Sequence, residues 1–322
     1  MSETKHRNLI VSSAPHVVSP VNTSRIMLDV IIALIPAMIM AVYVFGMRAL
    51  LLTASCVIAC VFFEWAFRKI TGRTNTISDL SAVVTGVILS FNLPANLPIW
   101  MAVIGCFVSI VVVKQLFGGI GQNFANPAIV GRIVLFISFA TPMTTWPLTR
   151  MQLASGAYDG VTGPTPLGLF QAGDMDALPA TRDMFLGFIG GSMGEVSALA
   201  LLIGGIYLIV RKVIEPTIPV CFIATVAVMA LLMGQNPAFH VCAGGVMLGA
   251  IFMATDYVTS PITTKGKVIF GIGCGILTML IRMFASYPEG VSFAILIMNI
   301  LTPLIDECTR MKLNGVPKGG EQ

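Results

Sequence analysis

The sequence predicts an all-α polytopic membrane protein with about ten transmembrane helices in two inverted five-helix repeats. Three observations lead to this fold class. Of the 322 residues, 56% are hydrophobic and only 11% are charged. Many apolar runs approach the length needed to cross a hydrocarbon core about 30 Å thick. In addition, two short motifs of the first half of the chain return in the second half, which indicates an internal duplication.

Ten apolar runs are predicted to form the membrane helices. In chain order they are Ile26 to Phe45, Ala49 to Phe67, Leu80 to Leu93, Ile99 to Phe117, Ile129 to Ala140, Val196 to Val210, Ile218 to Met233, Val241 to Ala254, Val268 to Ala285 and Val291 to Ile305. The third, fifth and eighth runs are short for a straight span, so we expect them to be broken or half-buried beside a site near the midplane. Mostly polar residues precede the first run, which argues against an N-terminal signal peptide.

The basic residues predict the orientation in the membrane. With ten spans and an inner N-terminus, only Arg48, Arg150, Arg182 and Arg282 of the nineteen basic residues lie on the outer side. The remaining fifteen, Arg132 among them, lie on the inner side, as the positive-inside rule requires. The net charge of +4 therefore reflects topology and not nucleic-acid binding. Both termini are expected in the cytoplasm of a bacterial or archaeal cell.

This orientation divides the chain into five regions. A cytoplasmic N-terminal segment covers residues 1–25, the first five-helix repeat covers 26–140, and an extracytoplasmic loop covers 141–185. The second five-helix repeat covers 186–306, and a cytoplasmic tail covers 307–322. An odd number of spans in each half forces the two repeats into opposite orientations.

The repeated motifs mark a candidate ligand site. Gly121-Gln122-Asn123 with Asn126-Pro127-Ala128 returns in compressed form as Gly234-Gln235-Asn236-Pro237-Ala238. The stretch Ala140 to Thr149 also matches Ala254 to Thr263 at five of ten positions. Unwound backbone at matching breaks can offer N–H and C=O groups to a ligand, so we expect Asn123, Asn126 and Asn236 to help bind a cofactor, with the two Asn-Pro-Ala segments facing each other near the midplane. The alternative is that Asn-Pro-Ala only starts a helix.

Acidic residues near the apolar runs are candidates for ion handling, because an ionisable group inside a span is costly. Asp29, Glu64 and Glu195 are the three ion-pathway candidates. Asp29 lies inside its span without an obvious partner. Glu64 precedes Arg68 by one helical turn, and Glu195 is expected in the first turn of its helix, so both also have a structural interpretation.

The cysteines and histidines predict neither a metal site nor a catalytic residue in this chain. The seven cysteines fall in or at the ends of apolar runs and include no CxxC pair. Buried thiols of this kind behave as small hydrophobic groups. The three histidines are scattered and form no catalytic pattern.

A loop segment in the predicted outer region, Asp159-Gly160-Val161-Thr162-Gly163-Pro164-Thr165, is rich in hydroxyl-bearing and small residues. Its small residues would leave the backbone and hydroxyl groups open to a modifying enzyme, and the prolines on both sides of Thr165 favour an extended backbone. Taken alone, the segment would be read as an exposed Gly/Pro turn.

Four features together resemble one known family. They are this loop motif, the segment Gly118 to Ala128 before Arg132, the opening Ser12-Ser13-Ala14-Pro15-His16, and the predicted ten-span repeat. The NqrB/RnfD family that they resemble contains RnfD, a membrane component of the Rnf complex, which is an ion-translocating ferredoxin:NAD oxidoreductase. It also contains NqrB, a component of the sodium-pumping NADH:quinone oxidoreductase. The resemblance to RnfD is the better one, because NqrB usually carries a longer N-terminal region.

The resemblance implies a covalent flavin. Members of the family carry FMN joined through its phosphate to the last threonine of the loop motif, which is Thr165 here, and a dedicated flavin transferase makes the bond. Asp159, Thr162 and Gly163 fit the motif, whereas Pro164 stands where alanine is usual. Whether a second, non-covalent flavin such as riboflavin binds between the halves is left open.

The function implied is that of a membrane flavoprotein that carries electrons between reduced ferredoxin and NAD while the complex exports Na⁺ or H⁺. The chain is not expected to be catalytic alone. NAD-binding and cluster-bearing partners in the Rnf complex would supply the remaining carriers, because neither a nucleotide-binding loop nor a cluster-binding cysteine set is present. The alternatives are a component of the sodium-pumping relative, or a solute channel or transporter with the same inverted-repeat fold.

Overall fold

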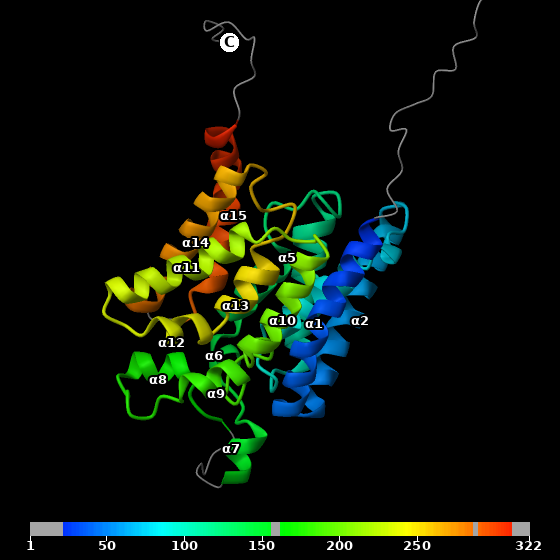
Figure 1. Ribbon diagram of the computed structural model, residues 1–322. Coiled ribbons are helices and arrows are strands. Elements are labelled where there is room, and N and C mark those ends of the chain that lie inside the picture. The colour runs from blue at the N-terminus through cyan, green and yellow to red at the C-terminus, as the bar shows by residue number, and fades with distance from the viewer. Residues whose placement is uncertain (1–21, 156–161, 286–288, 311–322) are drawn as a thin grey trace, which may run out of the picture.

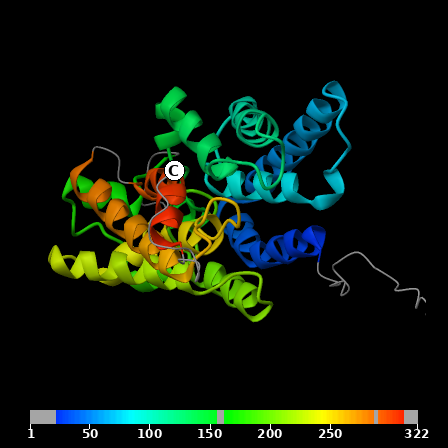
Figure 2. The same cartoon turned by 90° about the horizontal axis from the view of Figure 1, so that it is seen from above.

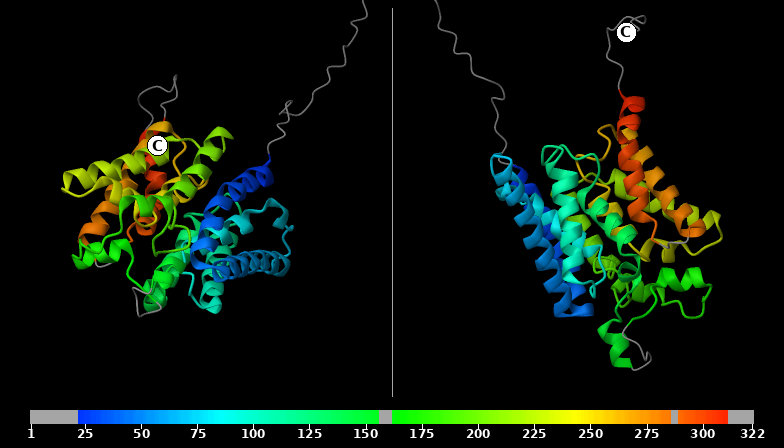
Figure 3. Two further views of the ribbon diagram at one scale, coloured as in Figure 1. Left: turned by 60° about the horizontal axis from the view of Figure 1, so that its bottom comes forward. Right: turned by 180° about the vertical axis from the view of Figure 1, so that it is seen from behind.

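The computed structural model describes residues 22–155, 162–285 and 289–310, and these residues form a bundle of helices without any named strand. Figure 1 shows that α1 starts and α15 ends at the same end of the bundle. The short helices α7 to α9 lie at the opposite end. Figure 3 shows the same arrangement from behind, with these short helices below the rest of the bundle.

Within the described residues, four helices are long and apolar enough to cross a membrane. They are α1 (Thr23–Phe45), α2 (Met47–Ile70), α14 (Thr264–Phe284) and α15 (Val291–Thr309). The Asn22 side chain caps α1, and Gly46 ends it with a positive φ of 81°. Because a left-handed residue of this kind is favourable mainly for glycine, the chain turns sharply there into α2.

Five shorter apolar helical stretches complete the bundle. They are α3 (Ser81–Phe91), α4 (Ile99–Phe107) continued by the π-helix η2 (Val108–Gln115), α5 (Pro127–Ser138), α10 (Ala198–Val210) and α11 (Thr217–Leu232). The predicted run at 241–254 is broken, as expected from its length, into the end of α12 (Pro237–Cys242), α13 (Val246–Leu248) and the π-helix η3 (Gly249–Met253).

The segment between α5 and α10 is folded and not an open loop. It contains α6 (Ala140–Thr144), α7 (Arg150–Ser155), α8 (Pro166–Ala172) and α9 (Thr181–Leu186). Leu167 of α8 and Met184 of α9 pack with Phe239 and Ala243 in a small apolar cluster of their own. This cluster fixes α8 and α9 against the start of the broken helix.

One helix from the second half of the sequence, α10, packs against the helices of the first half. Figure 2 shows α1 to α3 on one side of the bundle and α11, α14 and α15 on the other. Helix α10 crosses to the first group and packs on α1. A Cβ atom at Gly204 of α10 would lie 2.1 Å from the carbonyl oxygen of Ala33, so only glycine permits this approach.

Candidate functional site

The structure contains a cavity of about 390 Å³, here called the main cavity, between α1, α3, η2, α10 and η3. Its volume is in the range of small-molecule and cofactor sites. Most of the wall is apolar, including Val30 of α1, Val84 of α3 and Phe252 of η3. A few polar groups interrupt it, among them Ser81, Lys114, Asn123, Asn126 and Asp256. A mostly apolar cavity with a few polar groups on its wall suits a ring system with polar edges.

Asn126 ties the break before α5 to the second half of the chain. Its Oδ1 accepts hydrogen bonds from the backbone N–H groups of Ala128 (3.0 Å) and Ile129 (3.4 Å), which makes it the N-cap of α5. Its Nδ2 donates to the backbone oxygen of Met253, 3.2 Å away. The Asn299 side-chain amide donates to the Thr259 backbone oxygen at 3.2 Å, and its oxygen accepts from the Asn126 backbone N–H at 3.1 Å. Asn126 therefore combines a helix start with a tertiary contact at the cavity wall.

Asn123 and Asp256 form a second polar contact on the same wall. Asn123 Nδ2 donates to Asp256 Oδ2 at 3.4 Å, and Thr259 Oγ1 donates to the same carboxylate oxygen at 3.1 Å. Asp256 lies in the connection between η3 and α14. Burial raises the pKa of this carboxyl above its ordinary value, against the opposing effect of the hydrogen bonds from Thr259 and Asn123.

Asn236, the counterpart of Asn126 in the repeated motif, lies in a different environment. Its side chain is exposed and accepts one hydrogen bond, from the backbone N–H of Ala238 at 3.0 Å. It starts α12. The tertiary hydrogen-bond partners described for Asn126 are Met253 and Asn299, and Asn236 is not among them. The structure thus brings the first motif to the main cavity and leaves the second at a helix start on the surface.

Thr165 is buried, with 7% of its surface exposed, in contrast to the exposed loop position expected from the sequence. Its Oγ1 accepts a hydrogen bond from the Gly168 N–H at 3.1 Å and caps α8. The reason is local, because Pro166 occupies the first helical position and Thr165 becomes the N-cap. Thr165 lines a small pocket, here called the Thr165 pocket, together with Gly190, Gly191, Glu195, Gly244 and Glu289, among other residues.

The rest of the loop motif is only partly described. Asp159 lies outside the described residues. Thr162 is exposed and forms an isolated antiparallel bridge with Pro147. The Gly163 N–H donates to the backbone oxygen of Trp146 at 3.1 Å. These contacts hold the residues just before Thr165 against the segment that follows α6.

A buried charged cluster, here called the Arg132 cluster, adjoins the Thr165 pocket through Glu195 and Glu289, which also line that pocket. Arg132 Nη1 donates to Asn92 Oδ1 at 2.8 Å and lies 3.6 Å from Glu195 Oε1, and its Nη2 pairs with Glu289. Arg132 thus lies buried in the middle of α5. The buried Glu195 and the partly buried Glu289 supply the counter-charge for its guanidinium.

Two of the acidic candidates have environments that differ from those expected. Glu195 lies before α10 and not in its first turn, because Ser197 is the N-cap. Asp29 has partners, since Tyr207 Oη donates to its Oδ1 at 2.9 Å and Arg211 Nη2 lies 3.2 Å from its Oδ2. Both partners belong to or follow α10, which lies far from Asp29 in the sequence. Only the tertiary packing of α1 on α10 reveals this pair.

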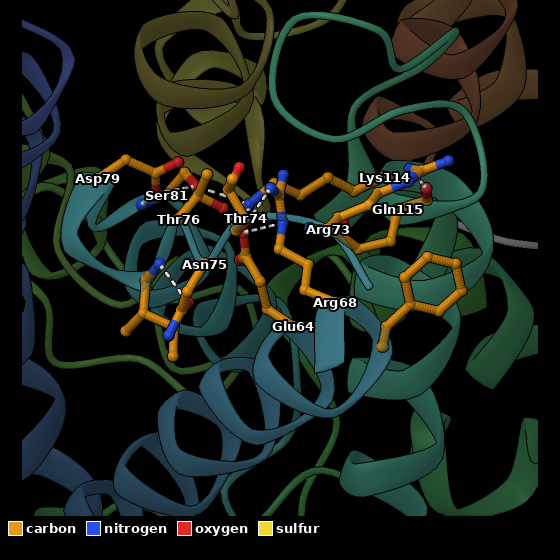
Figure 4. Close-up of polar contacts among 12 residues, drawn as sticks. Glu64, Arg68, Arg73, Thr74, Asn75, Thr76, Asp79, Ser81, Lys114 and Gln115 are labelled. Carbon is orange, nitrogen blue, oxygen red and sulfur yellow. Dashed lines mark hydrogen bonds and ion pairs between the residues drawn. The ribbon is translucent and has the colours of Figure 1, made fainter. Parts of the chain in front are cut away.

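Glu64, the third acidic candidate, makes its main contact with a residue that the sequence interpretation did not select. Lys114 Nζ lies 2.9 Å from Glu64 Oε2 and 2.5 Å from Ser81 Oγ, as Figure 4 shows for the surrounding polar network. The expected helical partner, Arg68, is farther away at 3.9 Å. A signal was present, because Lys114 is the only charged residue in the apolar run Ile99 to Phe117.

Comparisons with known proteins match the chain over nearly its whole length. The sequence model of the NQR2, RnfD, RnfE family matches residues 10–315. The D subunit of the Na⁺-translocating ferredoxin:NAD⁺ oxidoreductase complex of Acetobacterium woodii is 50% identical over 316 residues, covering 97% of this chain and 96% of the relative. The D subunit of the proton-translocating ferredoxin:NAD⁺ oxidoreductase complex of Clostridium ljungdahlii is 42% identical, covering 96% and 97%. The D subunit of the ion-translocating oxidoreductase complex of Stutzerimonas stutzeri is 40% identical, covering 91% and 92%.

Proposed function

The chain belongs to the NQR2, RnfD, RnfE family, and on this premise we propose that it is the D subunit of an ion-translocating ferredoxin:NAD⁺ oxidoreductase complex. The observation that carries the proposal is the near-complete, 50% identical match to a relative with that name. The helical bundle with four long apolar spans fits a protein that lies in the cell membrane. In this role the chain carries electrons within the complex while the complex exports Na⁺ or H⁺. The NAD site and the cluster carriers belong to partner subunits.

We propose further that Thr165 carries FMN through a phosphoester bond made by a flavin transferase. Two features of the site support it. The hydroxyl lies at the wall of a pocket whose lining includes Gly190, Gly191 and Gly244, which carry no side chains. Arg282 lies behind this wall, because a Cβ atom at Gly244 would lie 2.9 Å from Arg282 Nη2. Its guanidinium would partly offset the charge of a phosphoester beside Glu195 and Glu289, which also line the pocket.

The Thr165 hydroxyl must leave the α8 cap for the phosphoester to form, because the same oxygen accepts the Gly168 N–H. The pocket is only about 10 Å³, so the residues around it have to open for modification. When bound, FMN supplies one- and two-electron redox chemistry. The chain holds it at a fixed place and sets the surrounding charge.

The main cavity is the proposed site of a second, non-covalent flavin such as riboflavin. Its volume and apolar walls suit a ring system, and the groups that would contact a polar ring edge are Asn123, Asn126 and Lys114. Asn236 stays a candidate only on the strength of the repeated motif, since it is exposed. No group of three or more potential metal ligands occurs among the described residues.

The proposed topology has both termini in the cytoplasm and the segment 141–185 outside, with repeats over 26–140 and 186–306. The start of α1 and the end of α15 lie at the same end of the bundle, and α7 to α9 lie at the other end. Both observations support this arrangement. A broken helix at 241–254 also fits a second repeat that lines a site, as breaks do in inverted-repeat proteins.

Inverted membrane vesicles test the proposed function. Vesicles from cells with the intact chain should reduce NAD⁺ with reduced ferredoxin and accumulate Na⁺ or H⁺. Vesicles from a strain that lacks only this chain should lose both activities, and re-expression should restore them. Retention of ferredoxin-driven ion uptake without the chain would contradict the proposal.

A further inference from the structure

Lys114 is a buried ammonium held between oxygen ligands from two other parts of the chain. Its Nζ lies 2.9 Å from Glu64 Oε2 on α2 and 2.5 Å from Ser81 Oγ at the start of α3. The three residues are 3%, 0% and 6% exposed, respectively. Figure 4 shows these side chains directed toward one another. The ammonium therefore occupies a position that side-chain oxygens surround and solvent does not reach.

Two further side chains orient the oxygen ligands of the ammonium. Asp79 Oδ1 accepts from Ser81 Oγ at 2.5 Å, and Thr76 Oγ1 donates to Glu64 Oε1 at 3.0 Å. The Ser81 hydroxyl and the Glu64 carboxylate are therefore each held by a second contact. Carboxylate and hydroxyl oxygens are also ligands that hard cations accept.

Lys114 also faces the main cavity. Of the described residues that line this cavity, Lys114 is the one with a cationic side chain, and Ser81 lines it as well. Lys114 lies in the last turn of the π-helix η2. Segments of this kind occur often at functional sites. A lysine side chain is long and flexible, so its ammonium can move between neighbouring positions with little backbone change.

We propose that Glu64 and Ser81 form the binding site of a translocated monovalent cation, and that Lys114 occupies this site as a tethered cation until negative charge enters the main cavity. This inference rests on the proposed flavin in that cavity. One electron delivered there by the upstream carrier adds one negative charge, which attracts the Lys114 ammonium. Glu64 Oε2 then loses its closest cation, while Arg68 Nε stays 3.9 Å from Oε1, and one Na⁺ or one proton enters to replace the ammonium. Charge balances at one cation for each electron.

Infrared difference spectra of the purified whole complex test the exchange. The complex is oxidised and reduced electrochemically, in choline chloride or in sodium chloride of equal concentration. In choline chloride, reduction should produce a protonated-carboxyl band that Glu64→Gln abolishes. If the site takes Na⁺, sodium chloride should suppress this band, because Na⁺ then replaces the proton. If the site takes only protons, the band should be the same in both salts.

Lys114 variants separate the tethered-cation role from a structural one. In Lys114→Met, Glu64 should already hold its cation in the oxidised complex, so the Glu64 band should vanish from the redox difference. Lys114→Arg keeps the charge and should retain part of the band. The matched control is Lys69→Met on α2, an exposed lysine whose ammonium lies 4.8 Å from the Trp65 ring centre, and it should match the wild type.

The wild-type spectra alone can overturn the inference, even where a variant does not assemble. Absence of any carboxyl change on reduction in choline chloride would contradict it, and so would a band that survives Glu64→Gln. Flavin content, measured in each preparation after acid extraction and on denaturing gels, keeps the two proposals apart. Missing flavin would overturn the proposed function, whereas normal flavin content without a Glu64-dependent carboxyl band would overturn only the cation site.

Discussion

The side-chain amide of Asn126 donates a hydrogen bond to the backbone oxygen of Met253, 3.2 Å away and 127 positions later in the chain. The donor belongs to the break before α5, and the acceptor ends the π-helix η3. Two interrupted segments from different halves of the chain therefore meet at the wall of the main cavity. This contact gives the first Asn-Pro-Ala motif a role that a simple helix start lacks.

Replacing Asn126 by leucine should impair ion-coupled electron transfer more than replacing Asn236 by leucine. Asn126→Leu removes the α5 cap and leaves the Met253 carbonyl unpaired, at a cost of about 1–3 kcal/mol. Asn236→Leu removes one exposed cap, at about 1 kcal/mol. The measurement is Na⁺ or H⁺ uptake by inverted vesicles driven by reduced ferredoxin and NAD⁺, normalised to assembled complex.

Asn126→Ser serves as the control, because serine keeps a cap oxygen but is too short to replace the amide contact. We expect it to assemble normally and to pump as poorly as the leucine variant. Equal, normal pumping by Asn126→Leu and Asn236→Leu would show that both motifs only start helices.

The positions of the apolar helices could be predicted from the sequence, because hydropathy is a local property and survives any tertiary arrangement. Length marked three runs as candidates for a break, but only the run at 241–254 is broken, whereas α3 and α5 are continuous. Ion-pair partners could not be predicted, since Asp29 meets Arg211 and Glu64 meets Lys114 only through packing of distant helices. The capping role of Thr165 follows from the local Thr-Pro pattern, but its burial was missed because α8 is fixed by tertiary contacts with α9 and α12.

Loss of the Arg132 guanidinium should strongly destabilise the complex. Arg132→Met would leave the buried Glu195 and the partly buried Glu289 without this cation, and breaking a buried ion pair typically costs about 3–5 kcal/mol. Thermal denaturation of the purified complex measures the effect. The exposed Arg182→Met variant is the control and should change the midpoint little. An unchanged midpoint in Arg132→Met would show that the cluster is not a stabilising centre.

The stability contribution of Asp256 should depend on pH. Burial raises the pKa of this carboxyl in the folded protein, so the folded state binds the proton more tightly than the unfolded chain. Its contribution is therefore most favourable below the unfolded pKa and is lost as the pH rises through the folded pKa. The thermal midpoint of Asp256→Asn, relative to the wild type, should rise as the pH increases above about 4, where an ordinary aspartate of the unfolded chain ionises.

Asp174→Asn, at an exposed position, is the matched control for that series and should show a smaller pH-dependent difference from the wild type. If the Asp256→Asn difference falls with rising pH, burial does not dominate the titration of this carboxyl.

The segment 141–185 should be accessible from outside the cell. Asp176 is exposed after α8, so Asp176→Cys should react with an impermeant maleimide in spheroplasts. The native Cys308, exposed near the end of α15, provides the opposite reference and should react only after the membrane is opened. Labelling of Cys308 in sealed spheroplasts, with the introduced cysteine protected, would reverse the proposed topology.

Thr165 is the proposed attachment site of a covalent flavin, and substitutions can separate this role from its capping role. Thr165→Ser keeps both the hydroxyl and the cap. Thr165→Asn keeps a good N-cap but has no hydroxyl to esterify, and Thr165→Ala loses both, with about 1 kcal/mol of helix stability. Thr162→Ala changes an exposed neighbouring hydroxyl and should retain covalent flavin.

The most direct measurement is ultraviolet fluorescence of the denatured chain on a gel, followed by mass spectrometry of the peptide that contains Thr165. We predict a fluorescent wild-type band and the mass of FMN on Thr165. Thr165→Ser should give equal or weaker fluorescence. Thr165→Asn and Thr165→Ala should give no fluorescence, although the asparagine variant assembles normally. A wild-type chain without covalent flavin, or full fluorescence in Thr165→Asn, would contradict the assignment.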